Sequence, residues 1–369
     1  MEEMTLFLAG DVMTGRGIDQ ILPHPGDPRL HEGFMTSAIG YVRLAEQASG
    51  PIRRPVDYHY IWGDAIEELD RIAPDIRIIN LETSITQNGA PWPDKAVLYR
   101  MNPENIPCLT VARIDVCSLA NNHTLDWGYK GLEDTLATLE RVGIHYAGAG
   151  RDLARARAPV AVNVPGKGRV VIVAIGSPTS GIPLAWQATA KRPGLNITAD
   201  FAEDDVRRIR EQVEAVKKPG DVVVASIHWG PNWGFGVATA HTRFAHALIE
   251  SAGVDVVHGH SSHHVKGIEV HRGRLILYGC GDFLDDYEGI SGYEAFRDDL
   301  GLMYFPILDL KTGALIRLRM TPTRIRRMRI NRATGADVDW LINVLNEQGE
   351  RFGTSVELAE DGRLSLRWS

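Results

Sequence analysis

The sequence predicts a mixed α/β protein whose open, largely parallel sheets present polar side chains where their strands end. Short apolar runs of strand length alternate with longer segments in which apolar residues recur at helical spacing. Residues 221–227 are almost continuously apolar, as in a strand buried on both faces. Several of these runs stop at Asp, Glu, Asn or His, which is where open α/β sheets bind their ligands.

The order of the elements follows from the same periodicities. We expect strands over 5–9, 76–79, 114–119, 144–146, 160–164, 169–175, 221–227, 254–257, 268–270, 274–278 and within 301–318. We expect helices over 62–72, 131–142, 202–216, 241–252 and 338–348, followed by one short C-terminal strand. Segments near 22–60 and 87–100 are rich in Pro or Gly and show little periodicity, so we interpret them as lid insertions. The expected organisation is one catalytic domain over 1–320 with an extension over 321–369 packed on it.

Composition narrows the possible partners. The formal net charge of -7 over 369 residues gives no general reason to expect nucleic acid. The basic run over 324–329 alternates with apolar residues, which predicts the solvated edge of a strand. The three cysteines share no CxxC spacing and are expected to be free thiols in a reducing compartment. The N-terminus lacks the pattern of a secretory signal and no apolar run is long enough to span a membrane, so we expect a soluble, cytoplasmic protein.

Residues 118–128 (SLANNHTLDWG) are the most informative stretch, because polar groups directly follow an apolar run. Asn121, Asn122, His123 and Asp126 crowd a predicted strand-to-helix turn. His123 is the natural proton carrier, and Asp126 three residues later is placed to orient its ring.

Other predicted strand ends carry a matching set of side chains. Asp11 and Glu82 follow two of them, His228 follows a third, and four histidines within seven residues follow a fourth: His258, His260, His263 and His264. Carboxylates and imidazoles that converge on one rim are the ligands of one or two divalent cations. Simpler interpretations stay open, since Asp11 could cap a helix, Glu82 could be an exposed carboxylate, and not all four histidines need be ligands.

Together these blocks resemble a known family. Residues 10–16 (GDVMTGR), 80–82 (NLE), 119–128, 228–230 (HWG), 259–263 (GHSSH) and 281–283 (GDF) resemble successive motifs of the bacterial capsule-synthesis CapA (poly-γ-glutamate synthesis) proteins. That family is a branch of the calcineurin-like metallophosphoesterase superfamily. The resemblance covers most of residues 4–310 and implies a four-layer α/β/β/α sandwich with a metal at the strand ends.

The resemblance also implies roles for individual residues. The implied metal ligands are Asp11, Glu82, Asn122, His228 and His260. His263 is a further candidate ligand, and His123 is the implied acid or base. Histidines that do not touch the metal could pair with aspartates and move protons, so we also expect catalytic roles for Asp126, Asp11 and His263. Residues expected to contact a substrate are Arg16, Trp127, Trp229, His264 and Asp282, and a wider aromatic set could line the pocket: Trp62, Trp92, Trp127, Trp186, Trp229 and Trp233.

Departures from the phosphoesterase pattern shape the expected metal chemistry. Met13 stands where phosphoesterases place a histidine, Glu82 replaces an aspartate, and the closing histidines are two residues apart. These changes weaken the case for a tight two-metal centre and favour a hard cation such as Ca²⁺, Mg²⁺ or Mn²⁺, with Zn²⁺ or Fe also allowed.

Three functions are compatible with this pattern. The first is a metal-dependent enzyme that acts on a peptide or amide, either by hydrolysis or transfer or by epimerisation at Cα, where paired His and Asp residues move the protons. The second is a phosphoester hydrolase. The third is a non-catalytic accessory protein of capsule (poly-γ-glutamate) synthesis that uses the inherited fold as a scaffold.

Overall fold

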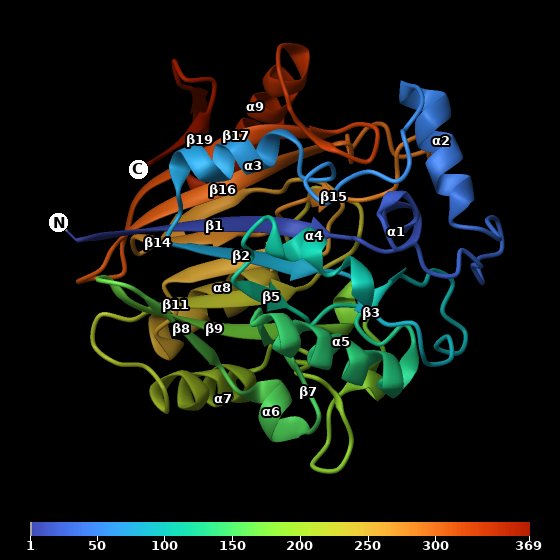
Figure 1. Cartoon of the computed structure of the whole chain (residues 1–369). Helices are drawn as coiled ribbons and strands as arrows, with labels where there is room; N and C mark the ends of the chain where they lie inside the picture. The colour runs from blue at the N-terminus through green and yellow to red at the C-terminus, as the bar shows by residue number, and fades with distance from the viewer. Residues whose placement is uncertain (1) are drawn as a thin grey trace.

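The computed structural model describes residues 2–369, and in this part of the chain two large sheets pack face to face (Figure 1). The larger sheet has the order β19 (Thr354–Leu358), β20 (Leu364–Trp368), β17 (Leu315–Ile325), β16 (Leu300–Asp309), β1 (Glu3–Val12), β2 (Ile76–Leu81), β5 (Val116–Ser118) and β6 (His145–Ala147). Two short strands extend it, β15 (Asp282–Leu284) beside β1 and β18 (Ile330–Arg332) beside β17. The smaller sheet has the order β13 (Ile268–His271), β14 (Arg274–Leu277), β12 (Val256–His260), β11 (Val222–His228), β9 (Gly168–Gly176) and β8 (Val160–Val164).

Helices and minor strands complete the fold. The longer helices are α2 (Ile39–Ser49), α3 (Asp64–Ile72), α5 (Gly128–Val142), α7 (Glu203–Glu214), α8 (Thr239–Ala252) and α9 (Ala336–Gly349). Short helices are α1 (Arg16–Ile21), α4 (Pro107–Thr110) and α6 (Leu153–Arg157). The minor strand pairs are β3 (Ser84–Ile85) with β4 (Arg100–Met101), and β7 (Ala149–Gly150) with β10 (Gly194–Leu195).

Strand alternation explains how the layers are held together. Leu6 and Leu8 of β1 point into a core that they share with Ile172 of β9 and Val224 of β11, so the inner faces of the two sheets pack on each other. Phe7 points the other way, into a second core with residues of α3, α4 and α5. A third core joins the outer face of the smaller sheet to α7 and α8. Burial of these apolar faces is the main favourable term in folding, and the predicted α/β class is confirmed.

The parallel strands of both sheets deliver their carboxyl ends to one edge. β1, β2, β5 and β6 are mutually parallel, as are β9, β11, β12 and β14. In Figure 1 the arrowheads of β1 and β2 point toward α1 and α2, whereas both chain ends lie at the opposite side. Side chains at the strand tips are thereby brought to the same rim.

The structure extends several predicted strands. β1 continues to Val12, because Asp11 pairs with Asp282 of β15 and with Asn80 of β2, and Asp11 therefore lies within the strand. β12 likewise continues to His260 through its pairing with β11. The approach of β15 to β1 requires a glycine, since a Cβ on Gly10 would lie 1.9 Å from the carbonyl oxygen of Gly281.

Two further differences lie outside the site. Where one C-terminal strand was predicted, the chain forms the β19–β20 hairpin, and β20 joins the large sheet beside β17. The 22–60 segment contains a helix, α2, that its Pro- and Gly-rich sequence did not predict. The three cysteines are free and buried, as expected. Among the residues described, no helix combines the length and apolar character needed to cross a membrane.

Candidate metal centre

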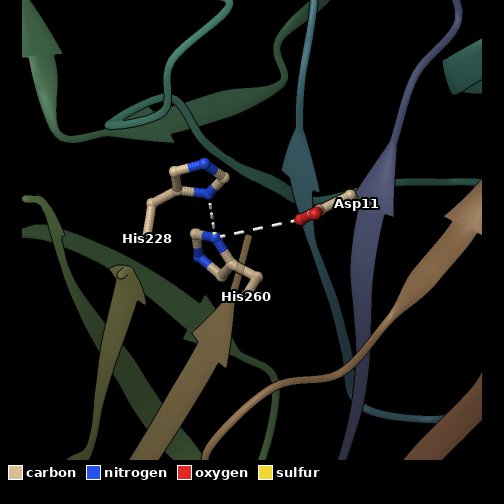
Figure 2. A group of neighbouring side chains, drawn as sticks. All are labelled: Asp11, His228 and His260. Atoms are coloured by element: carbon tan, nitrogen blue, oxygen red, sulfur yellow. Dashed lines mark hydrogen bonds and ion pairs between the residues drawn. The ribbon is translucent and has the colours of Figure 1, made fainter. Parts of the chain in front are cut away.

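Three strand tips bring Asp11 of β1, His228 of β11 and His260 of β12 together (Figure 2). One ligand atom from each lies within 4.8 Å of the other two. The Nδ1 atoms of His228 and His260 are 2.8 Å apart, and His260 Nδ1 is 4.0 Å from Asp11 Oδ1. All three side chains are fully buried, so the cluster is shielded from bulk water.

Glu82 and Asn80 complete this cluster from β2 and the residue after it. Glu82 Oε2 lies 4.0 Å from His228 Nδ1. The amide of Asn80 donates to Asp11 Oδ1 at 2.8 Å and to Glu82 Oε2 at 3.0 Å, which holds the two carboxylates side by side. Sequence analysis did not select Asn80, although its position two residues before Glu82 on an alternating strand was the available signal.

Asp11 also belongs to a second group of possible ligands, with His263 and Asp282. His263 Nδ1 is 2.9 Å from Asp282 Oδ1, which forms a buried His–Asp pair. Ser261 adopts a positive φ of 102°, and its backbone N–H donates to Asp11 Oδ2 at 3.3 Å. Strained backbone of this kind is retained where it positions a functional group, and here it directs a donor at the shared carboxylate.

A second His–Asp pair lies on the other side of Glu82. His123 Nδ1 is 2.6 Å from Asp126 Oδ2, and His123 Nε2 is 3.8 Å from Glu82 Oε1. The backbone N–H of Tyr99 also donates to Asp126 Oδ2, at 2.6 Å. Burial lowers the pKa of His123 to about 4. The ring is therefore neutral at pH 7, with Nδ1–H bound to Asp126 and the Nε2 lone pair facing Glu82.

Lys95 enters the site from the 87–100 segment, and sequence analysis missed it because this segment has no regular pattern. Its ammonium group lies 2.7 Å from Asp126 Oδ1, 3.0 Å from His123 Nδ1 and 2.8 Å from the Val97 carbonyl oxygen to which it donates. The lysine therefore neutralises Asp126 and ties the 87–100 segment to the His–Asp pair.

The buried charges around the rim do not balance within the protein. Seven carboxyl groups are buried here: Asp11, Glu32, Glu82, Asp126, Asp282, Asp285 and Asp286. Two side-chain cations, Arg16 and Lys95, face this group. Burial raises the pKa of Asp11 to about 6 and, together with the charge of Asp11, raises the pKa of Glu82 and of Asp282. Such a donor set, rich in carboxylate and imidazole and short of positive charge, fits a divalent cation.

The remaining predicted ligands and histidines lie close to the cluster in different positions. Asn122 Oδ1 is 3.0 Å from His228 Nε2, on the far side of the ring from His260, so Asn122 orients His228. His258 lies behind His260, with its Nε2 2.8 Å from the Ala9 carbonyl oxygen. His264 Nδ1 contacts the Val265 carbonyl oxygen at 3.1 Å, and its ring stacks on Phe296.

Three residues predicted to contact substrate are enclosed by protein. Four of the five N–H groups of Arg16 bind Asp286, Glu32 and Tyr41, and its side chain is 2% exposed. Trp229 is buried, donates to the Tyr278 carbonyl oxygen and stacks on His241. Trp127 donates to the Tyr99 carbonyl oxygen and lies under Arg100. Internal partners thus occupy the polar groups that would recognise a substrate.

The six tryptophans considered for a pocket divide by burial. Trp62, Trp127, Trp186 and Trp229 are buried, whereas Trp92 and Trp233 remain half-buried. Trp233 is the one that packs directly against a site histidine, with its ring centroid 5.2 Å from that of His263. It also stacks on Tyr293 at 4.0 Å, which makes an aromatic wall beside the His263–Asp282 pair.

Replacing Lys95 by methionine is expected to loosen the 87–100 segment by about 1 kcal/mol, because the variant leaves Asp126 without its cation. We expect about fivefold faster backbone amide exchange over residues 87–100, measured by mass spectrometry. Lys167→Met is the matched control, since Lys167 pairs with Asp75, outside the 87–100 segment, and should change exchange there little. Equal exchange in both variants would contradict the anchoring role.

The structure defines an α/β protein in which carboxylates and imidazoles gather at the strand tips in groups that could hold a metal ion. Residues 5–287 match the family described as bacterial capsule synthesis protein PGA_cap. The chain therefore belongs to this family, which confirms the resemblance to CapA proteins.

Relatives of known name are similar to this chain over most of its length. The chain is 49% identical over 364 residues to the "Probable polyglutamine synthesis accessory protein" of Mycobacterium tuberculosis, covering 98% of this chain and 96% of the relative. It is 28% identical over 317 residues to the "PGA biosynthesis protein CapA" of Bacillus subtilis, covering 86% of this chain and 70% of the relative. The "Capsule biosynthesis protein CapA" of Bacillus anthracis is 26% identical over 82% of this chain and 64% of that relative.

Proposed function

We propose that this protein is an accessory protein of the synthesis of a glutamate- or glutamine-based polymer, and that it contributes a cation-dependent acid–base site acting on amide groups of that polymer. The names of the relatives support the accessory role and favour it over a general peptide epimerase. The observation that carries the chemical part is the convergence of Asp11, His228 and His260 in a buried, carboxylate-rich cluster. A passive scaffold has no need of such a costly group of buried charges.

Asp11, Glu82, His228 and His260 would hold the cation, with Asn80 and Asn122 orienting them. When bound, a divalent cation supplies polarisation of a carbonyl oxygen or a lowered pKa of bound water. The hard oxygen donors of Asp11 and Glu82 favour Ca²⁺, Mg²⁺ or Mn²⁺, and the two imidazoles leave Zn²⁺ and Fe as alternatives. A second cation between Asp11, His263 and Asp282 would share Asp11 with the first.

The protein's own residues suit proton transfer on two sides of this cluster. Contacts run in order from His123 through Glu82, His228, His260 and Asp11 to His263, so the two His–Asp pairs lie at opposite ends. His123, neutral at pH 7, can accept a proton at Nε2 while Asp126 stabilises the charged ring. Amide hydrolysis or transfer needs one such pair, whereas inversion at Cα uses both.

The layered arrangement of sheets and helices supports the calcineurin-like metallophosphatase fold, and we propose that the chain adopts it. A phosphoester hydrolase is therefore the second candidate. The presence of Met13, buried and without a metal-binding nitrogen, where phosphoesterases carry a histidine argues for amide chemistry.

The test combines metal analysis with substrate assays on the whole chain. Elemental analysis of purified protein, and calorimetric titration with Mn²⁺, are expected to give one or two cations per chain. The titration is done on a His246→Ala background, because half-exposed His246, Glu269 and His271 also bring three ligand atoms within 4.8 Å. Absence of cation binding would overturn the cation-dependent site.

Incubation with a γ-linked glutamate oligomer in D₂O then separates the reactions. A mass gain of one water per cleaved bond indicates hydrolysis, and deuterium at Cα without cleavage indicates inversion. Cation and oligomer binding without either product would overturn the catalytic part and leave the accessory role. Turnover of an aryl phosphate in preference to the oligomer would select the phosphoesterase alternative.

A further inference from the structure

A continuous chain of hydrogen bonds runs behind His260, away from the candidate cation position. It begins at the Ala9 carbonyl oxygen on β1, where His258 Nε2 lies at 2.8 Å. His258 Nδ1 is 3.1 Å from the hydroxyl oxygen of Ser226, and the same oxygen is 2.9 Å from His260 Nε2. Ser226, His258 and His260 are all fully buried, so no bulk water competes for these groups.

The position of Ala9 explains why its carbonyl can accept a hydrogen bond from the other sheet. Ala9 pairs with Ile79 of β2 and Asp11 pairs with Asn80, so Gly10 is an extra residue in the β1 ladder. Such bulges interrupt a ladder and redirect groups beside functional sites. The bond from His258 therefore crosses between the sheets, from β12 to β1, two residues before Asp11.

When both rings are neutral, counting the protons fixes which group donates in each hydrogen bond of this row. A carbonyl oxygen only accepts, so His258 Nε2 must carry the proton and its Nδ1 must accept from the Ser226 hydroxyl. With its one proton given to His258, Ser226 accepts from His260 Nε2–H. His260 Nδ1 is then left as a bare lone pair that points toward His228 and Asp11.

Neutral rings satisfy every hydrogen bond of this row, because the partners of His258 are the Ala9 carbonyl oxygen and the Ser226 hydroxyl, and neither carries a charge. On the other ring, His228 Nε2 lies 3.0 Å from Asn122 Oδ1, which leaves His228 Nδ1 bare as well. Two lone pairs 2.8 Å apart repel each other unless a cation lies beside them.

We propose that Ser226 and His258 are positioning residues that lock His260 in the Nε2–H tautomer, so that its Nδ1 is always available to a cation. This inference rests on the proposed cation-dependent function and deepens it by assigning two residues behind the ligands. Partners of this kind fix the tautomer of a ligating histidine, and their loss typically weakens metal binding about 10- to 100-fold.

The competing explanation is that Ser226 and His258 merely satisfy each other inside the protein. In that case Ser226→Ala would lower stability as any buried serine does, but would leave the tautomer of His260 unchanged. In our proposal, the alanine variant removes the acceptor for Nε2–H and frees His260 to protonate Nδ1 and donate to His228 Nδ1. The fraction of chains with a bare Nδ1 then falls, and apparent affinity falls by the same factor.

The experiment compares the full chain, Ser226→Ala, Ser226→Thr and Ser118→Ala. Ser226→Thr keeps the hydroxyl. Ser118 is the matched control, because it is a fully buried strand serine of β5 whose hydroxyl has no hydrogen-bond partner among the residues described. The first measurement is ¹⁵N NMR of histidine-labelled, metal-free protein, with the His260 signals assigned by His260→Asn.

We expect the Nε2–H tautomer of His260 in the full chain, Ser226→Thr and Ser118→Ala, and its loss in Ser226→Ala alone. The second measurement is Mn²⁺ affinity by calorimetry, expected to fall at least tenfold in Ser226→Ala and to be restored in Ser226→Thr. An unchanged tautomer and affinity in Ser226→Ala would overturn the proposal. If Ser226→Ala does not fold, His258→Phe removes the hydrogen bond to Ser226 from the other side. The same loss of the Nε2–H tautomer and the same loss of Mn²⁺ affinity are then expected of this variant.

The two measurements can refute the cation site and the tautomer lock separately. Absence of Mn²⁺ binding in every variant, with the Nε2–H tautomer intact in the full chain, overturns the proposed cation site and leaves the tautomer lock standing. Normal Mn²⁺ binding by a Ser226→Ala variant with an altered tautomer overturns the role of the lock in cation binding and leaves the proposed function standing.

Discussion

Asp11→Asn is expected to lower Mn²⁺ affinity by more than about 100-fold while making the metal-free protein more stable at pH 7.5. The loss of affinity follows because Asp11 belongs to both groups of possible ligands. A direct ligand should cost more than the 10- to 100-fold typical of the residues behind ligands. Asparagine has nearly the same shape, so the fold is retained.

The gain in stability comes from removing a buried negative charge. Burial raises the pKa of Asp11 from 3.8 to about 6, so in the metal-free protein an ionised Asp11 opposes folding. Asp11 also raises the pKa of Glu82 and of Asp282, so removing its charge relieves these carboxyls as well, and we expect a gain on the order of 2 kcal/mol. Calorimetry measures the affinity, and urea denaturation in the presence of a chelator measures the free energy of unfolding.

Asp204→Asn is the control for this experiment. Asp204 lies in the first turn of α7 with its side chain 79% exposed, far from the strand tips, and its replacement should alter neither quantity. Opposite signs in affinity and stability are specific to a buried cation ligand. A variant that binds Mn²⁺ normally, or one that is destabilised without metal, would contradict the assignment of Asp11.

The convergence of Asp11, Glu82, His228 and His260 could be predicted because parallel strands end at one edge of a sheet. Each residue follows or closes an apolar run that is visible in the sequence. The pattern gives the edge and the residue types, but it does not give the orientation of a side chain. Asn122 was predicted to bind the cation, and only the structure shows that its Oδ1 lies 3.0 Å from His228 Nε2, the ring nitrogen opposite the one that faces His260.

Residues whose role depends on distant partners could not be found in this way. Arg16 lies in a motif of the family, but its partner Asp286 is 270 residues away. Only the folded structure shows that the two side chains form a buried ion pair. Ser226 is one small residue inside an apolar strand, and its significance appears when His258 and His260 of β12 lie beside it. The role of Lys95 could not be predicted, because it depends on the path of the irregular 87–100 segment, which brings the lysine to Asp126.

The stabilisation conferred by Mn²⁺ is expected to increase with pH between 5 and 7.5. In the metal-free protein the raised pKa of Asp11 means that its protonated form is favoured by folding. This contribution is fully present below pH 3.8 and is lost as pH rises through about 6. The metal-bound protein needs the ionised carboxylate, so protons compete with the cation below about pH 6.

For a single carboxylate, each pH unit below its pKa reduces cation affinity about tenfold, and the raised pKa values of Glu82 and Asp282 make the dependence steeper. The histidines add little to this dependence, because burial lowers the pKa of His228 and of His260 and so favours the neutral rings. Thermal unfolding with and without Mn²⁺ at pH 5, 6 and 7.5 measures the effect. In Asp11→Asn the residual shift in Tm should be small at all three values, whereas a pH-independent shift in the full chain would show that the cation binds away from these carboxylates.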